Sequence, residues 1–123
     1  MNIRLWAEQI VVGLFFIFIG ILHFVVPEGL PSQLEWMYDL STPVHYVTGV
    51  AEIMGGLGLI LPGLTKIGTR LTPLAALGLM VLMTGAIIWH IKRGELFNAG
   101  INLAVIMILG FIAYERWRIH PLQ

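Results

Sequence analysis

Glu52 is a single carboxylic acid within an apolar stretch, GVAEIMGGLGLIL, that covers residues 49–61. In apolar surroundings a carboxyl group is either neutral, because desolvation disfavours its charged form, or paired with a cation or a strong hydrogen-bond donor. His23, His45 and His90 are the available partners, because no Lys or Arg reaches the depth of Glu52 in the apolar stretches. A carboxyl and an imidazole that share a dry site can exchange a proton near neutral pH, as general acid and base catalysis requires. Glu52, His23 and His90 are therefore the candidate catalytic residues; the alternative is a hydrogen bond that only orients two helices.

Residues around Glu52 follow the spacing of three and four that defines one face of a helix. Small residues stand one turn above and below the acid, either to leave room for a flat apolar ligand or to let helices pack closely in lipid. Gly20 is likewise one turn from His23, and the amides Asn98 and Asn102 are four residues apart. The candidate ligand-binding residues are His45, Thr48, Gly49, Gly55, Gly56, Asn102, Phe16 and Gly20.

Metal chemistry has weaker support. The chain has no cysteine, which excludes disulfides, thiolate catalysis, cysteine-bound zinc and iron–sulfur clusters. His23 and His90 could ligate a haem iron across a helix bundle, but no further haem signature accompanies them. Glu52 lies too deep in its stretch to join both histidines around a zinc ion. We predict no metal ligands, disfavour haem, and regard a quinone as the better candidate for a bound cofactor.

The composition requires a membrane around these residues. Hydrophobic residues make up 58% of the 123 residues and charged residues only 11%, and the mean hydropathy is +0.87. A hydrocarbon core of roughly 30 Å needs about 20 apolar residues in a helix. Four stretches qualify, at residues 5–26, 43–61, 73–91 and 96–114. We predict one all-α domain over residues 1–123, a bundle of four transmembrane helices.

Local signals predict where these helices begin and end. Thr42 and Thr72 each precede a proline, a pattern typical of a capping hydroxyl followed by proline in the first turn. Pro62 and Gly63 predict the end of the second span. Between the first two spans, residues 32–40 begin with SQLE, a capping box, and carry apolar side chains for a short interfacial helix. We expect this helix to act as a lid.

The charges predict an orientation. Seven Lys and Arg balance seven Asp and Glu, so there is no basic excess for a nucleic acid partner. In a four-span layout, five of the seven bases lie on the side of the termini, and only Lys92 and Arg93 lie on the other. The positive-inside rule then predicts cytoplasmic termini, with the Lys92-Arg93 pair as the contrary feature. We expect a multi-pass protein of the bacterial inner (plasma) membrane.

Two motifs resemble one known family. GILHFVVPEGL and YVTGVAEIMGGLGLILPG, followed by a basic KIGTR segment, are similar to the DoxX-like family of small four-helix membrane proteins. The resemblance places the family's H-F-x-x-P on His23, Phe24 and Pro27. It also implies membrane redox associations, because members of the wider group are linked to thiosulfate:quinone oxidoreduction, redox complexes, dehydrogenase maturation and receptor assembly. The layout is also similar to that of the sterol-isomerase and sigma-2 receptor group, which act on a lipid inside the bundle.

Two functional hypotheses follow. The first is a subunit that handles a quinone, or another isoprenoid or lipid, between its helices; redox chemistry would then need a protein partner, because the sequence contains no evident electron carrier. The second is a non-enzymatic assembly or chaperone subunit, or a homodimer, whose polar interior only stabilises the bundle and whose surface recognises another membrane protein. The sequence leaves open whether the protein is an enzyme.

Overall fold

The computed structural model describes residues 2–122, and these residues form helices joined by short turns. The four long helices are each long and apolar enough to cross a membrane, so the protein is a multi-pass membrane protein. The predicted all-α bundle of four membrane helices is confirmed. In chain order the elements are α1 (Ile3–Val25), the 3-10 helix η1 (Ser32–Asp39), α2 (Thr42–Thr65), α3 (Leu71–Lys92), α4 (Leu96–Tyr114) and the π-helical turn η2 (Glu115–Ile119).

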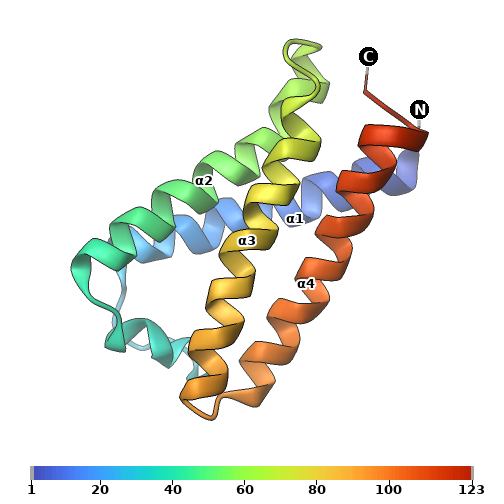
Figure 1. Ribbon diagram of the computed structural model, residues 1–123. Helices are drawn as coiled ribbons and strands as arrows, with labels where there is room; N and C mark the ends of the chain where they lie inside the picture. Colours follow the sequence, from blue (N-terminus) through green and yellow to red (C-terminus); the bar gives the residue numbers. More distant parts are fainter. Residues whose placement is uncertain (1, 123) are drawn as a thin grey trace.

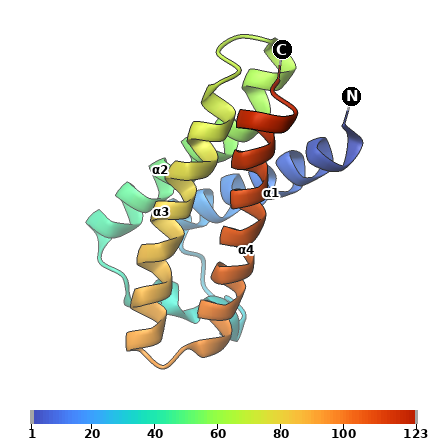
Figure 2. The same cartoon turned by 45° about the vertical axis from the view of Figure 1, so that its right-hand side comes forward.

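The helices pack as two pairs. α1 lies along α2 and α3 lies along α4, and contacts between α2 and α3 join the pairs. α1 and α4 approach each other near the two chain termini and then diverge (Figures 1 and 2). We call this the termini end of the bundle. The opposite end, where η1 and the turn between α3 and α4 lie, is the lid end (Figure 1).

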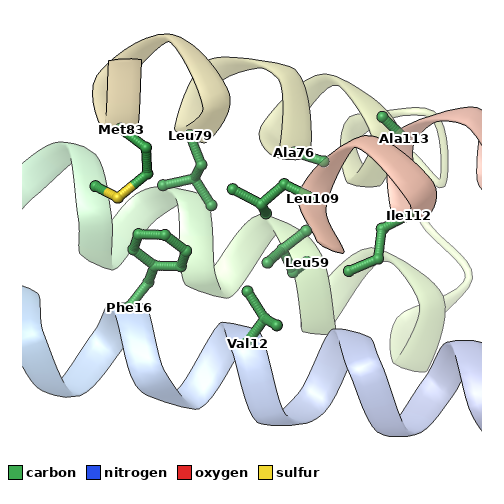
Figure 3. Close-up of a cluster of buried hydrophobic side chains, with 9 residues drawn as sticks. All are labelled: Val12, Phe16, Leu59, Ala76, Leu79, Met83, Leu109, Ile112 and Ala113. Atoms are coloured by element: carbon green, nitrogen blue, oxygen red, sulfur yellow. The ribbon is translucent and has the colours of Figure 1, made fainter. Parts of the chain in front are cut away.

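An apolar core joins the four long helices (Figure 3). Phe16, Leu59 and Leu109 are fully buried in it, although they come from three different helices. The complete cluster is Val12, Phe16, Leu59, Ala76, Leu79, Met83, Leu109, Ile112 and Ala113. In lipid such contacts stabilise the bundle through close packing and not through removal of apolar surface from water.

Glycines bring the backbones of α1 and α2 together at two levels. A Cβ atom at Gly56 would lie 2.5 Å from the carbonyl oxygen of Gly13, and one at Gly20 would lie 2.9 Å from that of Gly49. Both separations are shorter than a carbon and an oxygen atom tolerate. These glycines therefore allow a close helix contact that any larger residue would prevent.

Pro62 lies inside α2, which continues to Thr65, so the predicted helix end at Pro62 and Gly63 is wrong. Proline has no N–H, and its position deprives the Gly58 carbonyl of the usual partner four residues later. The hydroxyl of Thr72, on α3, donates to this carbonyl over 2.9 Å. A neighbouring helix thus satisfies the freed group, as helix-breaking residues in membranes require.

The predicted caps are also wrong. Thr72 is already inside α3, whose N-cap is Arg70, and its hydroxyl bonds to α2 instead. The residue before α2 is Ser41, and no side chain caps that helix. The SQLE segment forms a 3-10 helix with Pro31 at its N-cap and no capping hydrogen bond. α1, for which no cap was predicted, has one, because the Asn2 side chain accepts from the Leu5 N–H.

A polar cluster closes the termini end. Gln9 is fully buried on α1, and its amide donates 2.8 Å to the Leu59 carbonyl of α2. The same side chain accepts a 2.6 Å hydrogen bond from the guanidinium of Arg116 in η2. Arg116 also lies over the ring of Trp6. The π-helical turn therefore directs a cation into the bundle, where it links α1 and the end of α4.

Candidate functional site

Glu52 and His23 meet between α1 and α2. Both side chains are almost completely buried, with 2% of each residue exposed, and Glu52 Oε1 lies 3.0 Å from His23 Nε2. The oxygen does not lie along the ring N–H direction, and within residues 2–122 it has no hydrogen-bond partner. The two residues form a close acid–imidazole pair in which the carboxyl oxygen keeps unused hydrogen-bonding capacity.

Two further groups extend this pair toward the lid end. The Nδ1 atoms of His23 and His45 are 2.8 Å apart, which requires one hydrogen bond between the rings. The Nε2 atom of His45 is 2.8 Å from the Met37 carbonyl oxygen of η1. We call Glu52, His23 and His45 the triad. It connects the middle of α2 to the backbone of the lid segment η1.

Trp36 brings the second candidate histidine to the same region. Its ring contacts His23, with centroids 5.9 Å apart, and contacts His90 edge to face at 5.1 Å. Trp89 also packs against both Trp36 and His90. The aromatic side chains of η1 and α3 thus fill the space around the imidazoles, so the three candidate catalytic residues belong to one site although they do not all touch.

Ion pairs fasten η1 to the turn between α3 and α4. Arg93 donates to Asp39 of η1 and to Glu95, and Glu95 also lies 2.8 Å from Nδ1 of His90. Burial opposes ionisation of Glu95, but the hydrogen bonds from Arg93 and then His90 outweigh it and lower the pKa of Glu95 below its ordinary value. We call the contacts between Arg93, Asp39 and Glu95 the latch.

A cavity of about 430 Å³ lies beneath η1 and between the long helices. Its wall is mainly apolar and aromatic, while the acid of Glu52 and the imidazoles of His23 and His90 are exposed to it. The core residue Met83 lies at the boundary between the cavity and the apolar cluster. The lining residues are Phe15, Ile19, His23, Gln33, Leu34, Trp36, Leu40, Val44, Thr48, Glu52, Leu82, Met83, Gly85, Ala86, Trp89, His90, Asn98, Ile101 and Asn102.

The predicted site residues divide into two groups. Thr48 and Asn102 line the cavity with the three candidate catalytic residues, and His45 lies behind His23 without lining it. Five others lie outside the lining. Gly20, Gly49 and Gly56 lie at the contact between α1 and α2, Gly55 lies against Leu79 of α3, and Phe16 belongs to the apolar core.

Sequence reasoning did not assign several lining residues. Trp36 and Leu34 were expected only to lie in an interfacial helix, and no functional role was assigned to Trp89. The position of Trp89 beside His90 was a usable signal, because neighbouring residues at a helix end can both border one cavity. Nothing in the sequence places η1 under the ends of α3 and α4, since that depends on the latch.

A haem iron between His23 and His90 does not fit this arrangement. Both ring nitrogens of His23 already lie within 3.0 Å of other polar atoms. Trp36 packs against both rings. Within residues 2–122, no three His, Cys, Asp or Glu side chains are grouped to hold a metal ion.

Comparison with known proteins identifies one family. A sequence model of the DoxX-like family matches residues 7–112, which include all of α2 and α3, most of α1 and α4, and the whole cavity lining. No curated protein and no solved structure gives a significant match. The chain belongs to the DoxX-like family.

Proposed function

We propose that this DoxX-like protein binds a quinone, or another isoprenoid or lipid with an oxygen-bearing head group, in the cavity beneath η1. Glu52 exchanges a proton with that oxygen, and His23 shares the proton. One observation carries the proposal: Glu52, of which only 2% is exposed, lines a mainly apolar cavity and keeps a carboxyl oxygen without a hydrogen-bond partner among residues 2–122. An ionisable group is energetically costly in a membrane interior, and its presence there indicates a functional site.

The chemistry of the lining suits a flat head group. Small-molecule sites typically measure about 300 to 1,000 Å³ and combine an apolar wall with a few polar groups, and this cavity has about 430 Å³. Phe15, Trp36 and Trp89 provide aromatic surfaces for stacking. Asn98 and Asn102, from α4, offer amide donors that can bind a second carbonyl oxygen.

A long apolar tail needs a path into the lipid. α1 and α4 both contribute to the cavity wall, but they are joined mainly at the termini end, through Arg4 with Glu115 and Gln9 with Arg116. Toward the lid end the two helices diverge (Figure 2). A ligand tail leaving between them would enter the hydrocarbon core directly, which is the route a quinone needs.

We place the termini in the cytoplasm of a bacterial cell and the lid end at the outer face of the inner membrane. The count of Lys and Arg supports this orientation. Five of the seven bases lie at the termini end, and only Lys92 and Arg93 lie at the lid end.

The test compares two substitutions of the same residue, Glu52. Purified wild-type protein, Glu52→Leu and Glu52→Gln are extracted with organic solvent, and the extracts are analysed by mass spectrometry. We expect a quinone or other isoprenoid with the wild type and with Glu52→Gln, because the amide keeps a donor and an acceptor. The ligand should be lost from Glu52→Leu. A melting curve in detergent confirms that each variant is folded.

Other outcomes discriminate the assembly hypothesis. A folded wild-type protein that carries no hydrophobic ligand, and takes none up when a quinone is added, would contradict the proposal. It would favour the non-enzymatic assembly role, with Glu52 and His23 as a structural contact between α1 and α2. Equal ligand content in the wild type and Glu52→Leu would place the ligand elsewhere.

A further inference from the structure

We infer that the triad is a proton relay that carries a proton between Glu52 and the lid end through His45, and that contact with Met37 gates it. This inference rests on the proposed function, since it supplies the route by which a ligand proton taken up at Glu52 leaves the cavity. It assigns a positioning and relay role to His45, which does not line the cavity.

The backbone of η1 fixes the direction of the hydrogen bonds. A carbonyl oxygen only accepts, so Nε2 of His45 must carry a hydrogen to bond the Met37 oxygen at 2.8 Å. In a neutral imidazole the other nitrogen then has no hydrogen. Nδ1 of His45 therefore accepts, and Nδ1 of His23 must donate across their 2.8 Å contact.

The same logic locates the remaining proton. With His23 neutral and protonated at Nδ1, its Nε2 carries a lone pair and no hydrogen, and Glu52 Oε1 lies 3.0 Å from this nitrogen. A carboxylate there would oppose that lone pair, and an ionised Glu52 would also need aligned donors, yet Oε1 receives no aligned hydrogen bond within residues 2–122. Glu52 therefore carries the proton in the resting site, and the triad as a whole is uncharged.

Transfer along the triad then needs no diffusing ion. Glu52 gives its O–H proton to Nε2 of His23, the Nδ1–H of His23 moves to Nδ1 of His45, and His45 becomes a cation while Glu52 becomes a carboxylate. His45 loses its Nε2 proton to water at the lid end when the contact with Met37 opens. The Glu52 carboxylate accepts a replacement proton from the ligand hydroxyl, so one proton enters for each that leaves. Both imidazoles then hold their hydrogen on the opposite nitrogen, and they return to the starting tautomers before His45 can bond the Met37 carbonyl again.

The surrounding ionisable groups favour this path over one through His90. His90 lies across Trp36 from His23 and is bound to Glu95. On η1, Asp39 is paired with Arg93 in the latch. Within residues 2–122, no hydrogen bond or ion pair links either group to Glu52, whereas His23 and His45 form a continuous chain of contacts from it.

Infrared spectroscopy of the protein in lipid nanodiscs tests the relay. The carbonyl band of a protonated carboxylic acid should be present in the wild type and absent from Glu52→Gln. After transfer into heavy water, we expect its hydrogen–deuterium exchange to slow by at least about tenfold in His45→Phe. His120→Phe is the matched control, at an exposed histidine outside the cavity lining, and should exchange at the wild-type rate.

Several results would overturn the inference. They are a wild type without the Glu52 acid band, a folded His45→Phe that exchanges at the wild-type rate, and equal slowing in His120→Phe. If His45→Phe does not fold, Asp39→Asn decides: loosening the latch should speed exchange, and an unchanged rate contradicts the gate. Ligand extraction from the same samples distinguishes failure of the proton relay from failure of the proposed quinone site. If His45→Phe retains quinone and exchanges at the wild-type rate, the relay is refuted and the quinone site is not.

Discussion

The hydrogen bond from Thr72 to the Gly58 carbonyl offers a sharp test of how the bundle tolerates Pro62. We expect Thr72→Val, which keeps the shape of the side chain and removes the hydroxyl, to lower the free energy of unfolding by about 1 to 2 kcal/mol. A net hydrogen bond contributes about 0.5 to 1.5 kcal/mol, and a buried acceptor left unpaired costs about 1 to 3 kcal/mol. Measured interhelical hydrogen bonds in a membrane average only about 0.6 kcal/mol, so the lower part of this range is favoured.

Repeating Thr72→Val in a protein that also carries Pro62→Ala shows whether the loss of stability comes from the unpaired Gly58 carbonyl. In Pro62→Ala the residue regains an N–H, which can bond the Gly58 carbonyl within α2 as in any regular helix. Thr72→Val should then cost about 0.5 kcal/mol or less, since the acceptor is no longer orphaned. Thr84→Val is the matched control, because Thr84 bonds back to the Met80 carbonyl of its own unbroken helix. We expect its effect to be similarly small.

The measurement is reversible unfolding in mixed detergent micelles, followed for the four proteins of the double-mutant cycle. A coupling between the positions of about 1 kcal/mol is the expected result. If Thr72→Val costs the same with proline or alanine at position 62, the freed carbonyl is not the reason for its effect, and the explanation for the continuation of α2 past Pro62 is refuted.

Two further predictions concern packing and pH. Gly56→Ala should destabilise the bundle by about 1 to 3 kcal/mol, because its Cβ would meet a backbone oxygen, whereas Gly78→Ala, with nothing within 4 Å, should be neutral or stabilising; equal melting temperatures for the two variants would contradict this. Glu95 has a folded-state pKa below its ordinary value. Its ionised form therefore stabilises the folded protein fully at pH values above the ordinary pKa, about 4.3, and this stabilisation is lost as the pH falls through the folded-state pKa. Glu95→Gln should therefore flatten the fall of wild-type stability in acid, as measured by melting curves between neutral and acidic pH.

Long apolar runs made the membrane helices predictable from the sequence, because the hydrocarbon thickness sets their length. The predicted helix end that proved wrong was decided by a contact with another helix. Pro62 ends a helix when only local sequence is considered, and it does not do so here because Thr72 of the next helix satisfies the carbonyl of Gly58. Local sequence contains no sign of such a contact.

The candidate site shows the same limit. His23 was predicted as one of several possible partners of Glu52, because an acid in lipid needs a partner, and the structure brings the two within 3.0 Å. Whether glycines near the acid served packing or a pocket could not be decided from spacing, since both uses require small residues. In the structure Gly49 and Gly56 lie against α1, while the cavity opens on the Thr48 side of Glu52.

Fluorescence titration with a quinone that carries a short isoprenoid tail tests the central claim most directly. Trp36 and Trp89 line the cavity, so a bound quinone should quench them in a saturable way, and Trp36→Phe should reduce the quenching. We expect Glu52→Leu to raise the Kd for the quinone by about tenfold, the equivalent of one lost hydrogen bond. The Kd of Glu52→Gln should stay close to that of the wild type. Saturable quenching with the same Kd in the wild type and in folded Glu52→Leu would contradict the assignment of this cavity as a quinone site built around Glu52.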